Sequence, residues 1–254
     1  MNLIVDIGNT RAKIAVVDNR EVVEQIVVED VTSAMISDVT HRHTAIHQAI
    51  VASTRANAAQ VAKMIEEYVE RVVVFDPATT PIPIGNSYHT PETLGADRLA
   101  AAVGVAALYP ERDAMIVDFG TAITIDYVTG GVFRGGNISP GVTTRFRALA
   151  DYTASLPLCT ATEEVLEYGR TTREAIEQGV MRGVEQEVRG YVEDFLLKSC
   201  ENCTIFTGGD AKYFVKRIKN AIFADCEPVM YGLATILDYD AEILWRYLWS
   251  CGCA

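Results

Sequence analysis

The sequence lacks the features that would point to a membrane protein or a nucleic-acid-binding protein. None of its apolar runs approaches the roughly 18 residues needed to span a bilayer. The apolar start, Met1 to Val5, is interrupted by Asp6 and has no basic segment before it, so we expect no signal peptide and a cytoplasmic protein. No run of Lys or Arg exceeds two residues and the net charge is −12, which argues against nucleic-acid binding because such binding depends on clustered cations.

Metal-binding residues are also few. Four histidines are present, and the spacing of those at positions 41, 43 and 47 predicts surface or loop packing rather than a metal site. Of the six cysteines, Cys200 and Cys203 have the spacing of a metal knuckle, and Cys251 and Cys253 form a looser second pair. The alternative is that all six are reduced thiols, some of them buried as small hydrophobic residues. We expect the second case in a chain without a signal peptide.

The composition and the order of the expected elements indicate an α/β architecture. The 254 residues are 49% hydrophobic and 22% charged, which is ample for a packed interior in one large or two small domains. Strand and helix patterns alternate in both halves, and residues 109–112 are the most plausible boundary, giving lobes 1–112 and 113–254. The patterns predict strands at 14–17, 21–28, 72–75, 121–128 and 203–207, and helices at 58–71, 90–108, 162–168, 173–198, 211–220 and 229–249.

One phrase occurs twice, at residues 3–13 and 115–126. Each copy is a short apolar strand that ends in Asp-x-Gly, followed by hydroxyl-bearing residues and a second strand. Asp6 aligns with Asp118, and the glycines two residues later also align. The separation is far too long for a solenoid repeat and fits a duplication of a whole lobe. Two related lobes therefore face one ligand in the simplest interpretation.

The first copy has the chemistry of a phosphate loop. Gly8 lets the backbone pass close to a phosphate, and Asn9 and Thr10 can donate hydrogen bonds to its oxygens. Lys13 can supply positive charge, and Asp6 is a candidate Mg²⁺ ligand, directly or through water. An ordinary hairpin turn has a similar composition, but the second copy favours the functional interpretation.

The second copy and a later glycine pair complete the pattern. Thr121 can contact a phosphate and Asp118 a cation, while Gly208 and Gly209 follow a predicted strand and allow close approach of a flat ligand. Two such loops on opposing lobes and the later glycine turn resemble the acetate and sugar kinase, Hsp70 and actin superfamily. The resemblance implies two duplicated ribonuclease-H-like lobes (the actin-like ATPase fold) with mixed sheets flanked by helices.

The segment between the copies contains Gly95-Ala96-Asp97-Arg98 within the predicted helix 90–108. The Asp-Arg pair could be a routine surface salt bridge. Gly95 inside a helix costs about 1 kcal/mol relative to Ala, which indicates that something must approach closely there.

At this point the resemblance becomes specific. The motifs in chain order resemble type III pantothenate kinase over residues 3 to about 235: Asp6-x-Gly-Asn-Thr, Tyr88-x-x-Pro-Glu-x-Leu-Gly-Ala-Asp97-Arg98, Asp118-x-Gly-Thr-Ala-x-Thr, Gly135-Gly-x-Ile-x-Pro-Gly141 and Thr207-Gly-Gly-Asp. The Gly-Ala-Asp-Arg element distinguishes this family from other members of the superfamily.

The resemblance implies ATP-dependent phosphorylation of pantothenate to 4′-phosphopantothenate, the first step of coenzyme A biosynthesis. Asp97 matches the general base, and Asp118 matches the ligand of a monovalent cation, K⁺ or NH₄⁺. The family is homodimeric, and its pantothenate sites lie at the subunit interface. The residues matched to ATP are Asp6, Gly8, Asn9, Thr10, Lys13, Thr121, Gly208 and Gly209, and those matched to pantothenate are Tyr88, Gly95, Ala96, Arg98 and Thr172.

Two positions depart from the family's usual residues. Thr171 replaces the Asn that usually precedes the substrate-contact threonine, Thr172. Phe119 replaces the commoner Ala in the second loop, and strand alternation predicts that its side chain points away from the turn.

Two other functions compete with this interpretation. One is a kinase or phosphatase of the same superfamily acting on a sugar, acetate or polyphosphate, which gives no reason for the Gly-Ala-Asp-Arg element. The other is a non-catalytic regulator, since the family is related to accessory factors for transcription and a fold does not determine function. The joint presence of Asp97, Asn9, Lys13 and Asp118 argues against a catalytically dead relative.

Overall fold

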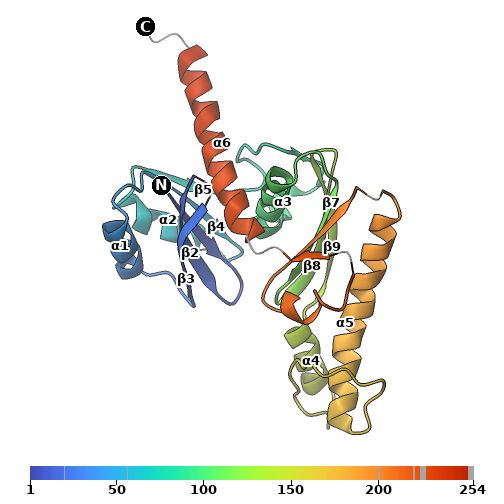
Figure 1. Cartoon of the computed structure of the whole chain (residues 1–254). Helices are drawn as coiled ribbons and strands as arrows, with labels where there is room; N and C mark the ends of the chain where they lie inside the picture. Colours follow the sequence, from blue (N-terminus) through green and yellow to red (C-terminus); the bar gives the residue numbers. More distant parts are fainter. Residues whose placement is uncertain (20, 56, 200, 220, 224–226, 251–254) are drawn as a thin grey trace. The chain divides into compact units, whose positions relative to one another are not determined.

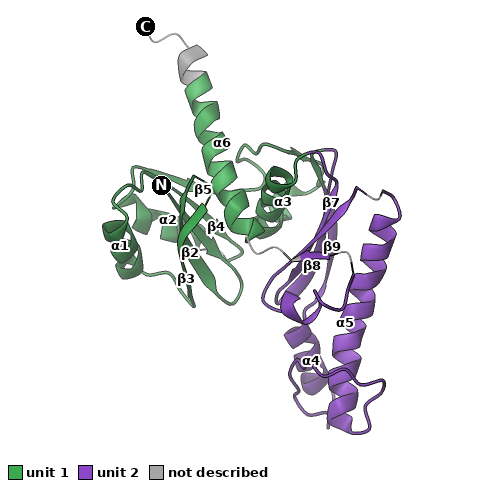
Figure 2. Cartoon of the chain, in the orientation of Figure 1, with its two compact units in different colours: residues 1–110, 131–133, 226–254 green, residues 111–130, 134–225 purple. Residues whose placement is uncertain are grey.

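A computed structural model describes residues 1–19, 21–55, 57–199, 201–219, 221–223 and 227–250, which divide into two compact units (Figures 1 and 2). Of these residues, unit 1 holds 1–110, 131–133 and 227–250, and unit 2 holds 111–130 and 134–223. The first division lies close to the boundary expected after residue 112. The C-terminal helix differs from the expectation, because by its contacts it is part of unit 1. Among the described helices, none is long and apolar enough to cross a membrane.

Unit 1 is built on a mixed sheet with the strand order β3-β2-β1-β4-β5. The strands β1, β2 and β3 are antiparallel neighbours, whereas β4 and β5 run parallel to β1. Their bounds are β1 Asn2–Ile7, β2 Ala12–Asp18, β3 Glu21–Val28, β4 Gln48–Ser53 and β5 Arg71–Val74. The predicted hairpin at 14–28 is confirmed, and Asn19 adopts the positive φ (48°) that its turn requires.

The two faces of this sheet follow the alternation of β1. Leu3, Val5 and Ile7 lie in one apolar cluster with side chains of α1 (Ser33–Arg42) and α2 (Ala58–Glu66). Asn2 points to the other face, where its amide donates to Asp238 of α6 (Pro228–Ser250). Helices therefore cover both faces.

Two glycines allow α3 (Ala96–Leu108) and α6 to cross at very short distance. A Cβ added at Gly232 would lie 1.8 Å from the carbonyl oxygen of Ala100, and one added at Gly104 would lie 2.1 Å from that of Pro228. Only glycine fits at these two positions while the backbones stay where they are. This packing joins the last helix of the chain to the helix that begins with the Gly-Ala-Asp-Arg element.

Unit 2 repeats the arrangement of unit 1. Its sheet runs β11-β10-β7-β8-β9, with β7 antiparallel to β8 and parallel to β10, and β10 parallel to β11. Asp118 is the fifth residue of β7 as Asp6 is of β1, so the duplication seen in the sequence is a duplication of structure. The bounds are β7 Ala114–Phe119, β8 Ala122–Thr129, β9 Val132–Pro140, β10 Cys203–Thr207 and β11 Ala221–Phe223. A two-residue strand, β6 (Gly85–Asn86), pairs with the unit 1 residues of β9, Val132 and Phe133.

Helices α4 (Val142–Asp151) and α5 (Thr172–Leu196) complete the core of unit 2 (Figure 1). Phe119 is buried and lies between Phe206 and Phe214, with ring centroids 5.1 and 5.0 Å away. The prediction that the Phe119 side chain points away from the turn is confirmed, and the ring adds aromatic packing to the core.

Three of the expected helices are corrected. The segment 162–168 is irregular. Its backbone amide at Leu166 donates a hydrogen bond to the side chain of Gln178 in α5. The helix expected at 90–108 is split into a short 3-10 turn, η1 (Pro91–Thr93), and α3. The helix expected at 211–220 is reduced to η2 (Ala211–Tyr213) followed by turns, and residue 220 lies outside the described residues.

Two of the six cysteines lie among the described residues. Cys159 and Cys203 are buried free thiols, and burial raises the pKa of the Cys203 thiol. Cys200, Cys226, Cys251 and Cys253 lie outside the described residues.

Candidate active site

The first phosphate loop connects β1 to β2 at the carboxyl end of β1. The amide of Gly8 donates to the carbonyl of Arg11 at 3.0 Å, which closes a tight turn with Asn9 and Thr10 exposed at its tip. Asp6 and Lys13 are register partners across the two strands, so their side chains share one face of the sheet. The loop thus presents exposed polar groups above a carboxylate and an ammonium on adjacent strands.

The end of β4 supports this loop through residues that the sequence analysis missed. The amide of Thr54 donates to the carbonyl of Ile7 at 2.9 Å, and Arg55 Nε donates to the carbonyl of Gly8 at 2.9 Å. The other end of the Arg55 guanidinium pairs with Asp30 at 2.9 Å. A cation directly after a buried strand was the signal that could have identified Arg55, because parallel strands bring their carboxyl ends to one edge of a sheet.

Lys13 has a partner that sequence reasoning also missed. Its Nζ donates to Oε2 of Glu227 at 2.7 Å, and Nε2 of Gln25 donates to the other carboxylate oxygen at 3.0 Å. Glu227 is distant in the sequence, and it immediately precedes α6. No sequence pattern near Lys13 predicts this contact.

The Gly-Ala-Asp-Arg element forms the start of α3. Gly95 is the N-cap residue, so the helix-interior cost expected for it does not apply. A Cβ at Gly95 would lie 2.5 Å from Oδ1 of Asp97, which means that the glycine leaves room for the carboxylate. That same oxygen accepts a hydrogen bond from the Arg98 amide at 2.8 Å, one of the helix's unpaired N-terminal donors. Ala96 is buried.

Burial raises the pKa of the Asp97 carboxyl, while the Arg98 amide and the Arg98 charge act in the opposite direction. Desolvation is the larger of the two effects, since it disfavours the charged form of a carboxyl group. A carboxylate with a raised pKa is a stronger base than a solvated one, which suits proton acceptance from a hydroxyl group.

Arg98 and Tyr88 lie next to each other beside Asp97. Arg98 is buried (7% exposed), and its guanidinium carbon lies 5.7 Å from the centroid of the Tyr88 ring. The Tyr88 backbone is held by the side chain of Asn86, which accepts from its amide at 2.9 Å. A buried guanidinium over an aromatic face is a fixed cation that can bind an anionic group.

In unit 2, the second phosphate loop is supported by the glycine-rich segment 135–141. The amide of Gly120 donates to the carbonyl of Ala122 at 3.1 Å and closes the turn after Asp118. The carbonyl of Thr121 accepts from the Gly141 amide at 3.0 Å and from the Thr144 hydroxyl at 2.7 Å. Two donors on one carbonyl fix the orientation of Thr121.

The predicted adenosine turn lies directly against the second loop. Gly208 has a φ of +92°, and a Cβ there would be 2.3 Å from Oδ1 of Asp118. The Asp210 amide donates to the carbonyl of Phe119 at 3.2 Å, and burial raises the pKa of the Asp210 carboxyl. A Cβ at Gly209, by contrast, would meet nothing within 4 Å. Gly208 therefore serves the packing against Asp118, and Gly209 leaves open space.

Thr172 is the first residue of α5 and is exposed. The preceding Thr171 caps this helix, accepting from the Glu174 amide at 3.2 Å, while Glu174 accepts from the Arg170 amide at 2.7 Å. Thr, like Asn, is a favoured N-cap residue and makes the cap bond here, so the departure at position 171 keeps the local structure.

Candidate metal ligands are limited to single carboxylates. In the part of the chain that the structure describes, no three His, Cys, Asp or Glu side chains group together as a ready metal site. His43 instead contacts Glu24 at 2.6 Å, and His41 and His47 are exposed. Asp6 and Asp118 have the oxygen donors that Mg²⁺ and K⁺ accept, and the remaining ligands would come from ATP and water.

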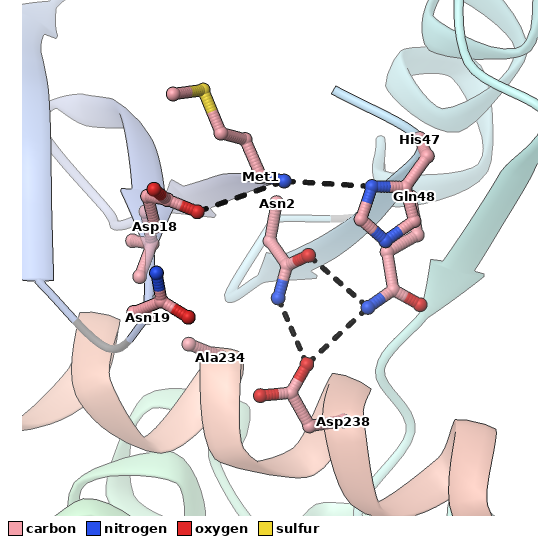
Figure 3. A pocket seen from close by; sticks show the side chains of 9 residues that line it. Met1, Asn2, Asp18, Asn19, His47, Gln48, Ala234 and Asp238 are labelled. Carbon is pink, nitrogen blue, oxygen red and sulfur yellow. Dashed lines mark hydrogen bonds and ion pairs between the residues drawn. The ribbon is translucent and has the colours of Figure 1, made fainter. Parts of the chain in front are cut away.

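A polar pocket lies at the opposite end of β1 from the phosphate loop (Figure 3). It has a volume of about 200 Å³ and is lined in part by Asn2, Gln48 and Asp238. Gln48 Nε2 donates to Asn2 at 3.1 Å and to Asp238 at 3.3 Å, and Asn2 donates to Asp238 at 2.9 Å. These bonds fasten α6 to the first residues of β1 and β4.

Comparison with solved structures places the chain in a known fold. The activator of 2-hydroxyisocaproyl-CoA dehydratase from Clostridium difficile, solved with bound ADPNP, aligns with a TM-score of 0.54 at 15% identity, covering 96% of this chain and 97% of that one. A Campylobacter jejuni protein named for the Baf family of transcriptional activators aligns with a TM-score of 0.59 at 21% identity, covering 94% and 99%. The fold is that of the actin-like ATPases and sugar kinases, as predicted.

Comparison of sequences identifies the family. The sequence model for type III pantothenate kinase matches residues 2–194. The type III pantothenate kinase of Phocaeicola vulgatus is 38% identical over 96% of this chain and 100% of its own length, and that of Porphyromonas gingivalis strain W83 is 35% identical over 94% and 98%. The chain therefore belongs to the type III pantothenate kinase family.

Proposed function

We propose that this chain transfers the γ-phosphoryl group of ATP to the primary hydroxyl group of pantothenate, giving 4′-phosphopantothenate for coenzyme A biosynthesis. The observation that carries the proposal is the start of α3, where a half-buried carboxylate with a raised pKa, Asp97, adjoins the fixed cation of Arg98. In a family of phosphotransferases this is the arrangement needed to hold an anionic substrate and accept a proton from its hydroxyl group.

Asp97 orients the pantothenate hydroxyl group and accepts its proton. Because phosphoryl transfer has a loose transition state, the proton can leave late and a carboxylate suffices as base. Arg98 binds the pantothenate carboxylate, Tyr88 packs beside it, and Gly95 and Ala96 shape the substrate site around Asp97. Most of the acceleration comes from positioning and charge neutralisation.

The ATP phosphates are assigned to the loop residues Gly8, Asn9 and Thr10, to Lys13, and to Thr121. Gly209 leaves the space for adenosine, and Gly208 allows the close turn that carries it. Asp6 would hold Mg²⁺, directly or through water, and the ion would neutralise phosphate charge. Asp118 would hold K⁺ or NH₄⁺; its carboxylate, packed against Gly208, is a suitable oxygen ligand.

A homodimer with Thr172 at the pantothenate site and a cytoplasmic location complete the proposal. Exposed apolar side chains in unit 2, among them Ile138 (62%) and Tyr152 (89%), supply surface that a second copy could cover. Sedimentation at several protein concentrations tests the dimer, and a monomer throughout would contradict it.

ATP consumption by the purified protein tests the function. We expect ADP release that requires pantothenate and a monovalent cation, with Asp97→Asn lowering kcat by about 10²–10⁴-fold. Activity with a sugar or acetate instead would favour another kinase of the superfamily. Absence of ADP release with all of these acceptors would favour a non-catalytic regulator.

A further inference from the structure

The ion pair between Lys13 and Glu227 is not explained by the proposed function, which needs the Lys13 ammonium on the ATP phosphates. Lys13 Nζ lies 2.7 Å from Oε2 of Glu227, and the two side chains are 35% and 33% exposed. A second donor, Gln25 Nε2, lies 3.0 Å from the other carboxylate oxygen. The carboxylate is thus held by two strands at once.

The register of the sheet shows that the two donors to Glu227 lie on the same face. Lys13 on β2 faces Asp6 on β1 on one side and Val27 on β3 on the other. Gln25 is two residues from Val27 and shares the sheet face of Lys13. The Glu227 carboxylate therefore lies over one face of the sheet, where Lys13 of β2 and Gln25 of β3 both donate to it.

Glu227 adjoins a helix that is held by several contacts. It immediately precedes α6, which is fixed to β1 and β4 through Asp238 (Figure 3) and to α3 through the contact at Gly232. Lys13, in contrast, carries its charge on a flexible four-carbon stem. If the pair separates, the lysine moves and the carboxylate stays.

We propose that Glu227 is a counter-ion latch for Lys13, pairing with the ammonium until the ATP phosphates take it over. Glu227 is a positioning residue that acts through Lys13. The proposal rests on the ATP binding of the proposed function, but it does not depend on which hydroxyl group is phosphorylated.

The Lys13–Glu227 ion pair must break when Lys13 binds the ATP phosphates. The free energy of ATP binding is therefore less favourable by the energy of that pair. Pairs at this exposure contribute up to about 1 kcal/mol, which corresponds to a factor of about five in a dissociation constant. Glu227→Gln should therefore lower the Kd for ATP by about two- to fivefold. A purely supporting role for Glu227 predicts the opposite, a weaker affinity.

The test is calorimetric titration of the full chain with Mg-ATP, without pantothenate. Glu227→Asp keeps the charge but shortens the side chain by one methylene group, which weakens the pair with Lys13; the latch predicts a Kd between those of the wild type and Glu227→Gln. Glu24→Gln is the matched control: it removes one negative charge from β3, but its partners are Arg42 and His43. Its Kd should equal that of the wild type.

A double-mutant cycle with Lys13→Met completes the test. In that background no ion pair is broken on binding, so the gain from Glu227→Gln should shrink. The latch would be overturned if Glu227→Gln lowered the Kd for ATP by the same factor with Lys13 and with Met at position 13. It would also be overturned if Glu227→Gln and Glu227→Asp both had a Kd at or above the wild-type value. Pantothenate phosphorylation is assayed separately, so that a failure of the proposed substrate and a failure of the latch are told apart.

Discussion

The crossing of α3 and α6 gives the sharpest test of the packing in unit 1. In a Gly232→Ala variant the new Cβ would start 1.8 Å from the Ala100 carbonyl oxygen, whereas ordinary contact begins at 3.4 Å. The obstacle is helix backbone, which cannot rotate away as a side chain can. Overpacking of this kind costs about 3 kcal/mol, at the upper end of the usual range. Alanine recovers about 1 kcal/mol of helix propensity, so we expect a net loss of about 2 kcal/mol.

Gly179→Ala is the matched control, because Gly179 lies in α5 and its added Cβ would meet nothing within 4 Å. This variant should gain up to about 1 kcal/mol in unfolding free energy. Urea unfolding followed by circular dichroism measures both. The two substitutions are chemically identical, so a Gly232→Ala protein as stable as Gly179→Ala would refute the close crossing.

Three further predictions concern the site itself. Because burial raises the pKa of Asp97, the ionised carboxylate costs stability above that raised pKa, and Asp97→Asn should raise the melting temperature at neutral pH. The advantage should disappear as the pH falls through the raised pKa; a gain that is constant with pH would contradict the argument. Arg98→Lys should raise the KM for pantothenate about tenfold while leaving the Kd for ATP unchanged, since an ammonium cannot replace the planar guanidinium beside Tyr88. Steady-state kinetics measure this KM. An unchanged KM would show that Arg98 is not part of the substrate site. Gly208→Ala should weaken activation by K⁺, because its Cβ would displace the Asp118 carboxylate; equal K⁺ titrations of activity for variant and wild type would count against Asp118 as the ion ligand.

Local patterns were sufficient to predict the elements that carry the site. The repeated strand-turn-strand is encoded in a few adjacent residues, with alternation in the strands and glycine in the turns, and β1, β2, β7 and β8 form where expected. The N-cap at Gly95 was missed for a local reason. Helical periodicity runs through residues 90–108, but the backbone at Leu94 is extended and ends the 3-10 turn.

Contacts between segments distant in the sequence determine the features that local patterns did not predict. Glu227 meets Lys13, and Gly232 meets Ala100, only because α6 returns to the first unit, and neither contact leaves a pattern in the intervening chain. The raised pKa of Asp97 likewise depends on what the fold packs around it. The sequence by itself determined the duplicated strands, the loop chemistry and the family, because these depend on residues close together in the chain. The partner of Lys13, the crossing of α3 and α6 and the partial burial of Asp97 depend on distant segments, which only the packed structure brings together.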